Sequence, residues 1–210
     1  MRKLLLLLPI LLLFSHKTEA QFFEKNHLYG NLGISGGNYF GSNVGANLIL
    51  DEKIFINAGV LTLQVDATEK PDDYSAGSGI FGSGDSDITD RYTQPYLSGG
   101  YVMKLGSKFR LVLPVGLAIQ FRRYATNFTI HETQGTFGGY SFGSSPSHDF
   151  EWKKDVSMAF IFNPRIEFLL SHIYGVGVSP LLVLNKHNTF VGLSVNNLIG
   201  KIRQRTPVTD

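Results

Sequence analysis

The sequence predicts an all-β protein, an eight-stranded antiparallel up-and-down transmembrane β-barrel, and three observations carry this prediction. First, the stretch 109–121 (FRLVLPVGLAIQF) places a large apolar residue at every odd position. Second, seven other segments of the 210-residue chain alternate in a similar way. Third, the links between these segments include three short turns and two long polar stretches, the pattern of barrels that cross the outer membrane.

Each expected strand is defined by a period of two, because successive side chains of an extended chain point to opposite faces. The stretch 109–121 is long for a strand of a soluble protein but suits a tilted crossing of a bilayer. The eight expected strands are residues 28–35, 44–50, 54–65, 94–104, 109–121, 155–170, 174–184 and 189–199.

The links between strands predict which end of the barrel lies outside. Residues 51–53, 105–107 and 171–173 are expected to form tight turns, whereas 66–92 and 125–154 are expected to be long irregular external loops. A three-residue turn preserves the alternation, so that Leu50 and Ile54 fall on the same face. An even number of strands also places both chain ends on the side of the short turns.

The chemistry of the two faces predicts membrane rather than water around the barrel. One face carries Phe, Leu, Ile and Val, whereas the other is mostly Gly, Asn and Ser with a few charges. Small polar residues suit a crowded lumen, and bulky apolar residues suit contact with lipid. The alternative is a soluble barrel or sandwich, which would need a polar outer surface.

The first 20 residues have the plan of a secretory signal peptide. Arg2 and Lys3 precede the apolar run 4–14, and a small residue, Ala20, precedes the expected cleavage site. A retained membrane anchor is the alternative, although eleven apolar residues are too few for a spanning helix. The expected organisation is therefore a signal peptide at 1–20, a barrel at 21–200 and a C-terminal tail at 201–210.

Charge and cysteine content exclude some partners. Of 19 basic and 17 acidic residues, three basic ones and one acidic one lie in the signal, which leaves 16 of each. A chain without net charge gives no indication of nucleic-acid binding. The sequence has no cysteine, so disulfides and thiolate chemistry are excluded.

Five polar residues of the expected sixth and fifth strands are the candidate site. If these strands pair about a loop centred near residue 138, Arg110 lies opposite Glu167, and the two should form an ion pair inside the lumen. The favoured interpretation is a structural plug, and a polar constriction is the alternative. The expected lumen cluster is Arg110, Arg122, Asn163, Arg165 and Glu167.

Catalytic, cofactor and metal sites are not expected. Asp85, Asp87 and Asp90 lack the spacing of a calcium loop and are interpreted as a solvated acidic loop tip. Adjacent residues such as Ser147, His148 and Asp149 alternate faces and cannot form a triad among themselves. Aromatic residues near strand ends are expected to form membrane-interface girdles: Tyr29, Tyr96, Tyr124, Phe128, Tyr174 and Phe190.

The whole chain after residue 20 resembles the small eight-stranded outer-membrane barrels of the OmpA/OmpX type, and especially the outer-membrane β-barrel domain proteins of Bacteroidetes. The features that carry this resemblance are the signal, the strand count, the phrase LVLPVGLAIQF, and the phrases GVGV at 175–178 and FVGL at 190–193. The resemblance implies residence in the outer membrane, with its lipids and the barrel assembly machinery as partners. One departure is that the chain continues past Ile199, whereas many such barrels end on an aromatic residue.

The expected function is non-enzymatic: a structural or surface-interaction protein that binds an extracellular ligand through its long loops, where function commonly lies. The first alternative is a narrow channel for small or hydrophobic molecules. The second is a lipid A acyl-modifying enzyme.

Overall fold

A computed structural model of the protein describes residues 26–71, 88–137 and 140–203, with the side chains of 130–148 left out. The signal peptide expected at 1–20, residues 204–210 of the tail, and Asp85 and Asp87 therefore lie outside the described residues. No helix in the described ranges has the length and apolarity needed to cross a bilayer.

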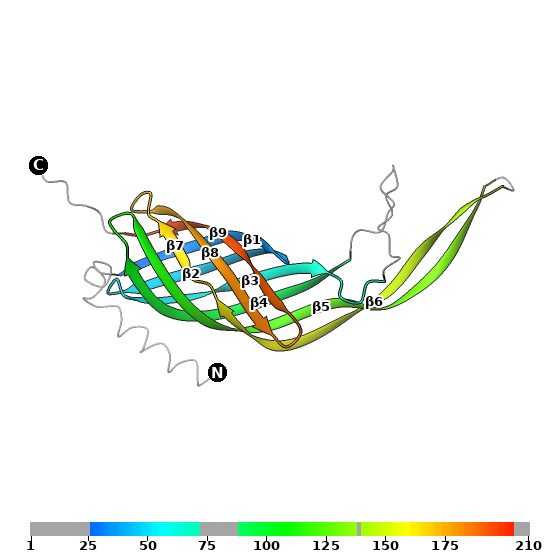
Figure 1. The fold of residues 1–210 in the computed structure, drawn as a ribbon, viewed down its shortest axis with the longest axis horizontal. Coiled ribbons are helices and arrows are strands. Elements are labelled where there is room, and N and C mark those ends of the chain that lie inside the picture. The colour runs from blue at the N-terminus through cyan, green and yellow to red at the C-terminus, as the bar shows by residue number, and fades with distance from the viewer. Residues whose placement is uncertain (1–25, 72–87, 138–139, 204–210) are drawn as a thin grey trace, which may run out of the picture.

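The strands close into one antiparallel ring, shown in Figure 1. The order is β4-β3-β2-β1-β9-β8-β6-β5, and pairing between β4 and β5 closes it. The bounds are β1 (His27–Gly37), β2 (Phe40–Leu50), β3 (Ile54–Asp66), β4 (Thr89–Lys104), β5 (Phe109–Phe137), β6 (Tyr140–Phe162), β7 (Arg165–Phe168), β8 (Tyr174–Asn185) and β9 (Thr189–Gly200).

Segments β6 and β7 form one strand of the barrel with a break between them. Both pair with β5 on one side and with β8 on the other. The break falls at Asn163 and Pro164, and proline has no backbone N–H to donate to the ladder. The ring therefore has eight strands, which confirms the predicted fold class.

The apolar residues of the alternating pattern face outward, as predicted. On β5, Leu117 and Ile119 are 57% and 52% exposed, whereas Val112 and Gln120 are fully buried in the lumen. Every strand segment contributes exposed large apolar side chains to the outer wall. Such a wall requires lipid around it, and closure of the ring satisfies the backbone within lipid. The protein is therefore a transmembrane β-barrel of the outer membrane.

The two ends of the barrel differ, and we name them by their connections. The turn end carries the links 51–53, 105–108 and 169–173, all of them short, whereas the loop end carries the long link between β3 and β4 beside the short links 38–39 and 186–188. The link 51–53 is a tight turn in which Asp51 and Glu52 both have positive φ, 48° and 59°. That geometry matches the twist of the strands it joins.

The predicted irregular loop at 125–154 is wrong, because these residues form a long strand pair. Strands β5 and β6 pair as far as Phe137 and Tyr140, well beyond the other strands, and we call 124–137 with 140–153 the arm. Figure 1 shows the arm projecting from the barrel. The pairing shifts register near Asn127, whose φ is +55°, a conformation that asparagine tolerates. A strand pair that projects from the barrel needs no row of apolar residues facing lipid, so the sequence there lacks the period of two that marks the other strands.

The loop predicted at 66–92 is longer than the observed connection, because residue 66 belongs to β3 and residues 89–92 belong to β4. Asp66 still pairs with Thr89 in the ladder between β3 and β4. The connection is thus 67–88, of which 72–87 lie outside the described residues.

Candidate functional site

The predicted pairing of Arg110 with Glu167 is present inside the turn-end half of the lumen. The two residues are cross-strand partners of β5 and β7. The Arg110 Nε donates to Glu167 Oε2 at 2.5 Å, and the two side chains are 4% and 0% exposed. A second donor, Arg110 Nη1, binds the carbonyl oxygen of Ile202 at 2.8 Å. Each charge is thus opposed by a hydrogen-bonded partner, which offsets the cost of its burial.

Tyr29 of β1, predicted to lie in a membrane-interface girdle, instead contacts this ion pair inside the lumen. Its hydroxyl donates to Glu167 Oε1 at 3.0 Å, and its ring lies 4.9 Å from the Arg110 guanidinium carbon. The expectation of a membrane-interface girdle is therefore wrong for Tyr29. Tyr29 lies two positions from Asn31 and six from Ser35, so an alternating strand places all three side chains on the same face. Asn31 and Ser35 are buried in the lumen, and this alternation could have placed Tyr29 there as well.

Arg165 lies close to the pair without joining it through a hydrogen bond. Its Nη1 is 3.6 Å from Glu167 Oε1, and its guanidinium carbon lies 5.5 Å from the centre of the Phe55 ring. The side chain runs across Gly177 of β8, where a Cβ would come within 2.7 Å of the Arg165 Cδ. The glycine is therefore what leaves room for the arginine.

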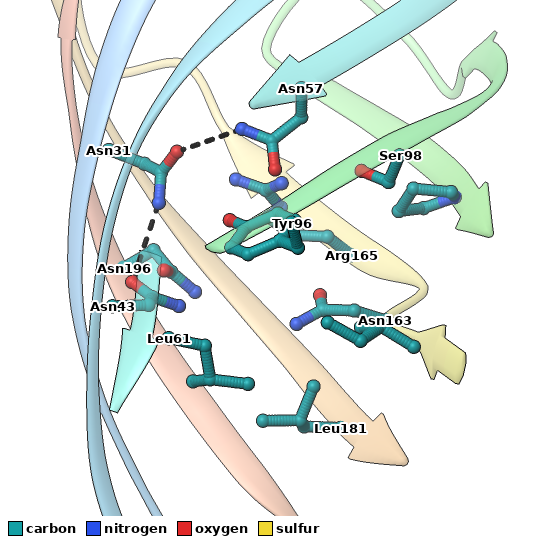
Figure 2. Close-up of a pocket in the computed structure, with 12 residues that line it drawn as sticks. Asn31, Asn43, Asn57, Leu61, Tyr96, Ser98, Asn163, Arg165, Leu181 and Asn196 are labelled. Atoms are coloured by element: carbon teal, nitrogen blue, oxygen red, sulfur yellow. Dashed lines mark hydrogen bonds between the residues drawn. The ribbon is translucent and has the colours of Figure 1, made fainter. Parts of the chain in front are cut away.

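A layer of asparagines fills the middle of the lumen beside Arg165 (Figure 2). Asn47 donates to Asn31 at 2.8 Å, and Asn57 donates to Asn47 at 3.0 Å. The layer surrounds a cavity with about 20 Å³ of room for water, which Arg165 and Asn163 also line. The small polar residues predicted for the lumen are found at this level.

Bulky apolar side chains occupy the lumen on both sides of the polar layer, which the sequence analysis did not expect. The loop-end cluster is Tyr39, Leu61, Leu63, Tyr92, Ala118, Ala159, Ile161, Leu181, Val183 and Phe190. The turn-end cluster is Tyr29, Ile49, Phe55, Val102, Val112, Leu169, Leu198 and Ile202. Phe190, expected in a girdle, is 1% exposed and lies in the first of these clusters.

The start of the C-terminal tail belongs to the turn-end cluster. The amide of Lys201 donates to the Leu28 carbonyl at 2.9 Å, and that of Ile202 donates to the His172 carbonyl at 3.0 Å. The Ile202 side chain is fully buried. These contacts hold the tail across the turn end of the barrel.

Arg122 lies far from the other residues of the predicted cluster, so the expectation of one lumen cluster is wrong. It is twelve residues from Arg110 along β5, which is about 40 Å of strand. At the loop end its Nη2 donates to Asp90 Oδ2 at 2.7 Å, and Thr68 donates to the same oxygen at 2.9 Å. Asp90 is fully buried in β4, which corrects its interpretation as part of a solvated tip.

The Arg122 contacts brace the base of the arm. Just above them, Ala125 of the arm packs with Ala67 and Ile88 of the connection between β3 and β4 in a small buried cluster. The Thr126 hydroxyl also donates to Glu69 of that connection. The first residues of the arm are thus fixed to the barrel by apolar, polar and charged contacts together.

The described residues show no metal-binding group of three or more His, Asp or Glu side chains. Residues 147–149 are consecutive positions of β6, paired with 129–131 of β5. The side chains of Ser147 and His148 lie outside the described set.

At the turn end, Lys104 hydrogen-bonds Glu52 in the turn between β2 and β3. This hydrogen bond lowers the pKa of the Glu52 carboxyl from its ordinary value of 4.5. His27 lies 3.7 Å from the same carboxylate. Lys104 and Glu52 thus form a charged pair at the rim of the turn end.

The ring, the apolar outer wall and the filled lumen define the class: a small eight-stranded outer-membrane β-barrel. Among solved structures, the chain is similar to the Yersinia pestis outer membrane protein Ail in a phospholipid bilayer nanodisc, with 11% identity, 83% of this chain and 98% of that one covered, and a TM-score of 0.45. It is also similar to Neisserial surface protein A, with 10% identity, 83% and 95% covered, and a TM-score of 0.45. No family model and no curated protein matches the sequence.

Proposed function

We propose that the protein is a non-enzymatic surface-interaction barrel that presents its arm outside the cell to bind an extracellular partner. The observation that carries this proposal is the extension of β5 and β6 past the last pairing with β4, at Arg123, and with β8, at Ala159. Longer connections of outer-membrane barrels lie on the extracellular side, so the arm would face outward.

The filling of the lumen supports a role outside the barrel rather than transport through it. An eight-stranded barrel is just wide enough for side chains to fill, and apolar clusters lie on both sides of the polar layer here. The braced base supports the same proposal, because a rigidly placed arm loses little conformational entropy on binding.

Edges of the arm are the part most suited to a partner. Beyond Arg123, β5 pairs with β6 and with no other described strand, and the outer edges of such a two-stranded ribbon suit addition of a strand from another chain. At the base, Trp152 is 42% exposed, and its ring lies 4.2 Å from the Arg123 guanidinium carbon. Exposed aromatic and arginine side chains are enriched among residues that dominate binding energy.

The proposal includes the steps that bring the barrel to the surface. Residues 1–20 would direct export and be removed, after which the assembly machinery would insert the barrel among outer-membrane lipids. The similarity to the OmpA/OmpX type and to the Bacteroidetes barrel proteins supports this route through the signal, the strand count and the phrase LVLPVGLAIQF.

The test removes the arm and keeps the barrel. Replacing 127–150 by Asn-Gly would join Thr126 to Glu151, which are cross-strand partners. Cells displaying the shortened and the full chain would be compared for adhesion to immobilised matrix proteins, glycosaminoglycans and a second layer of the same cells. The shortened barrel should still show heat-modifiable mobility on a denaturing gel and should lose adhesion. Equal adhesion by the two forms would contradict the proposal.

A further inference from the structure

We propose that the cavity beside Arg165 binds one small monoatomic anion, chloride under physiological conditions, as the counter-ion of a buried guanidinium. This site is separate from the arm, and the anion proposal does not depend on the proposed role of the arm. Three features of the lumen point to such an ion: its charge balance, the unsatisfied donors of Arg165 and the room in the cavity.

Positive charge exceeds negative charge within the turn-end half of the lumen. The deeply buried charged side chains described there are Arg110, Arg165 and Glu167, at 3%, 4% and 0% exposed. The neighbouring rim pair of Lys104 and Glu52 is balanced in itself, and His27 beside it adds no negative charge. The two guanidinium groups therefore share one carboxylate, and one positive charge is in excess between the two apolar clusters of the lumen.

Glu167 cannot balance both guanidinium groups, because it carries a single negative charge and its stronger contact is with Arg110. Oε2 accepts from Arg110 at 2.5 Å, and Oε1 accepts from Tyr29 at 3.0 Å. The 3.6 Å between Arg165 Nη1 and Glu167 Oε1 is too long for a hydrogen bond.

Two donors of Arg165 remain unsatisfied by the described part of the chain. Its Nε and Nη1 are buried and find no hydrogen-bond acceptor there. Leaving charged donors unpaired in a low-dielectric interior is strongly unfavourable, and contact with the Phe55 ring replaces only part of the lost hydration. A ligand that accepts hydrogen bonds and carries negative charge satisfies both needs.

The cavity next to Arg165 has the size and lining for such a ligand. Its room for water is about 20 Å³, and about 10–15 Å³ is enough for one water. A single monoatomic anion such as chloride therefore has room there. The amides of Asn163 and Asn196 each leave a buried oxygen that no described residue hydrogen-bonds. Because amide orientation is assigned from its partners, either amide can turn an NH₂ group toward an anion.

The first test measures thermal unfolding of the barrel, purified from membranes into a zwitterionic detergent, in sodium chloride and in sodium gluconate at equal ionic strength. We expect Tm to be about 3 °C or more higher in chloride, since a ligand bound to the folded state alone stabilises it. Arg165→Met, which removes the charge and keeps the bulk, should abolish the difference between the salts.

The matched control is Arg122→Met, which removes an arginine already paired with Asp90. It should lower Tm in both salts and keep the difference between them. The proposal is wrong if the wild type has the same Tm in both salts, or if Arg165→Met keeps the difference.

A second measurement needs no variant. Crystals grown in sodium bromide should show an anomalous peak within hydrogen-bond distance of Arg165 Nε or Nη1. A peak absent from that position, with an ordered water there instead, would overturn the proposal.

Discussion

The Tyr29 hydroxyl and the Glu167 carboxylate meet across the lumen, although β8 and β9 lie between their strands and 138 residues separate them in sequence. Arg110 on β5 binds the same carboxylate and also the carbonyl of Ile202. A single carboxylate thus connects three strands, and through Arg110 it is connected to the start of the tail.

Removing this carboxylate should destabilise the barrel strongly. Glu167→Ala leaves Arg110 buried without a counter-charge, and we expect a loss of about 3–5 kcal/mol in the free energy of unfolding. Urea unfolding in lipid vesicles measures it. Tyr29→Phe removes one hydrogen bond and should cost only about 1–2 kcal/mol. If Glu167→Ala leaves the unfolding midpoint unchanged, the ion pair has no structural role.

The second prediction concerns the brace at the base of the arm. Asp90→Asn weakens the contact with Arg122, so the first residues of the arm should open more often. Hydrogen exchange at 124–126 should become faster, whereas exchange at 112–118 in the barrel should stay unchanged. The matched control is Asp155→Asn, whose carboxylate contacts His187 in the link between β8 and β9 instead. Equal effects of the two variants would show that the Asp90 contact does not brace the arm.

A third prediction follows from the lowered pKa of Glu52. A lowered pKa in the folded state means that the stabilising contact is present above the unfolded value near 4.5, and that it is lost as pH falls through the folded value. NMR titration of the Glu52 carboxyl should therefore give a midpoint below 4.5. Lys104→Met should move it upward because it removes the main cause, whereas Lys53→Met in the same turn should not. A midpoint unmoved by Lys104→Met would exclude Lys104 as that cause.

The fourth prediction concerns conduction. Apolar side chains lie in the lumen on both sides of the polar layer, so planar-bilayer recordings of the wild type should show no sustained open level. The double variant Phe190→Ala and Ile202→Ala thins both clusters and should increase brief openings. A stable wild-type conductance that Arg165→Ala abolishes would instead favour the narrow channel.

The candidate site could be predicted only where it depends on local register. Pairing of β5 and β6 about a centre near residue 138 places Arg110 opposite Glu167, and this follows from counting along two strands. The same counting cannot tell how far along the barrel a residue lies relative to strands it does not touch. Arg122 was therefore grouped with Arg110, although it binds Asp90 at the other end.

The sequence by itself determined the strand count, the short turns and the outward face, because a period of two assigns each side chain to one of two faces. Only the tertiary structure decided which inward residues meet across the lumen, since those contacts depend on ring closure and on the stagger between strands. It also decided that 125–154 is a strand pair, because a ribbon that projects from the barrel is held together by backbone hydrogen bonds, which every residue except proline can donate.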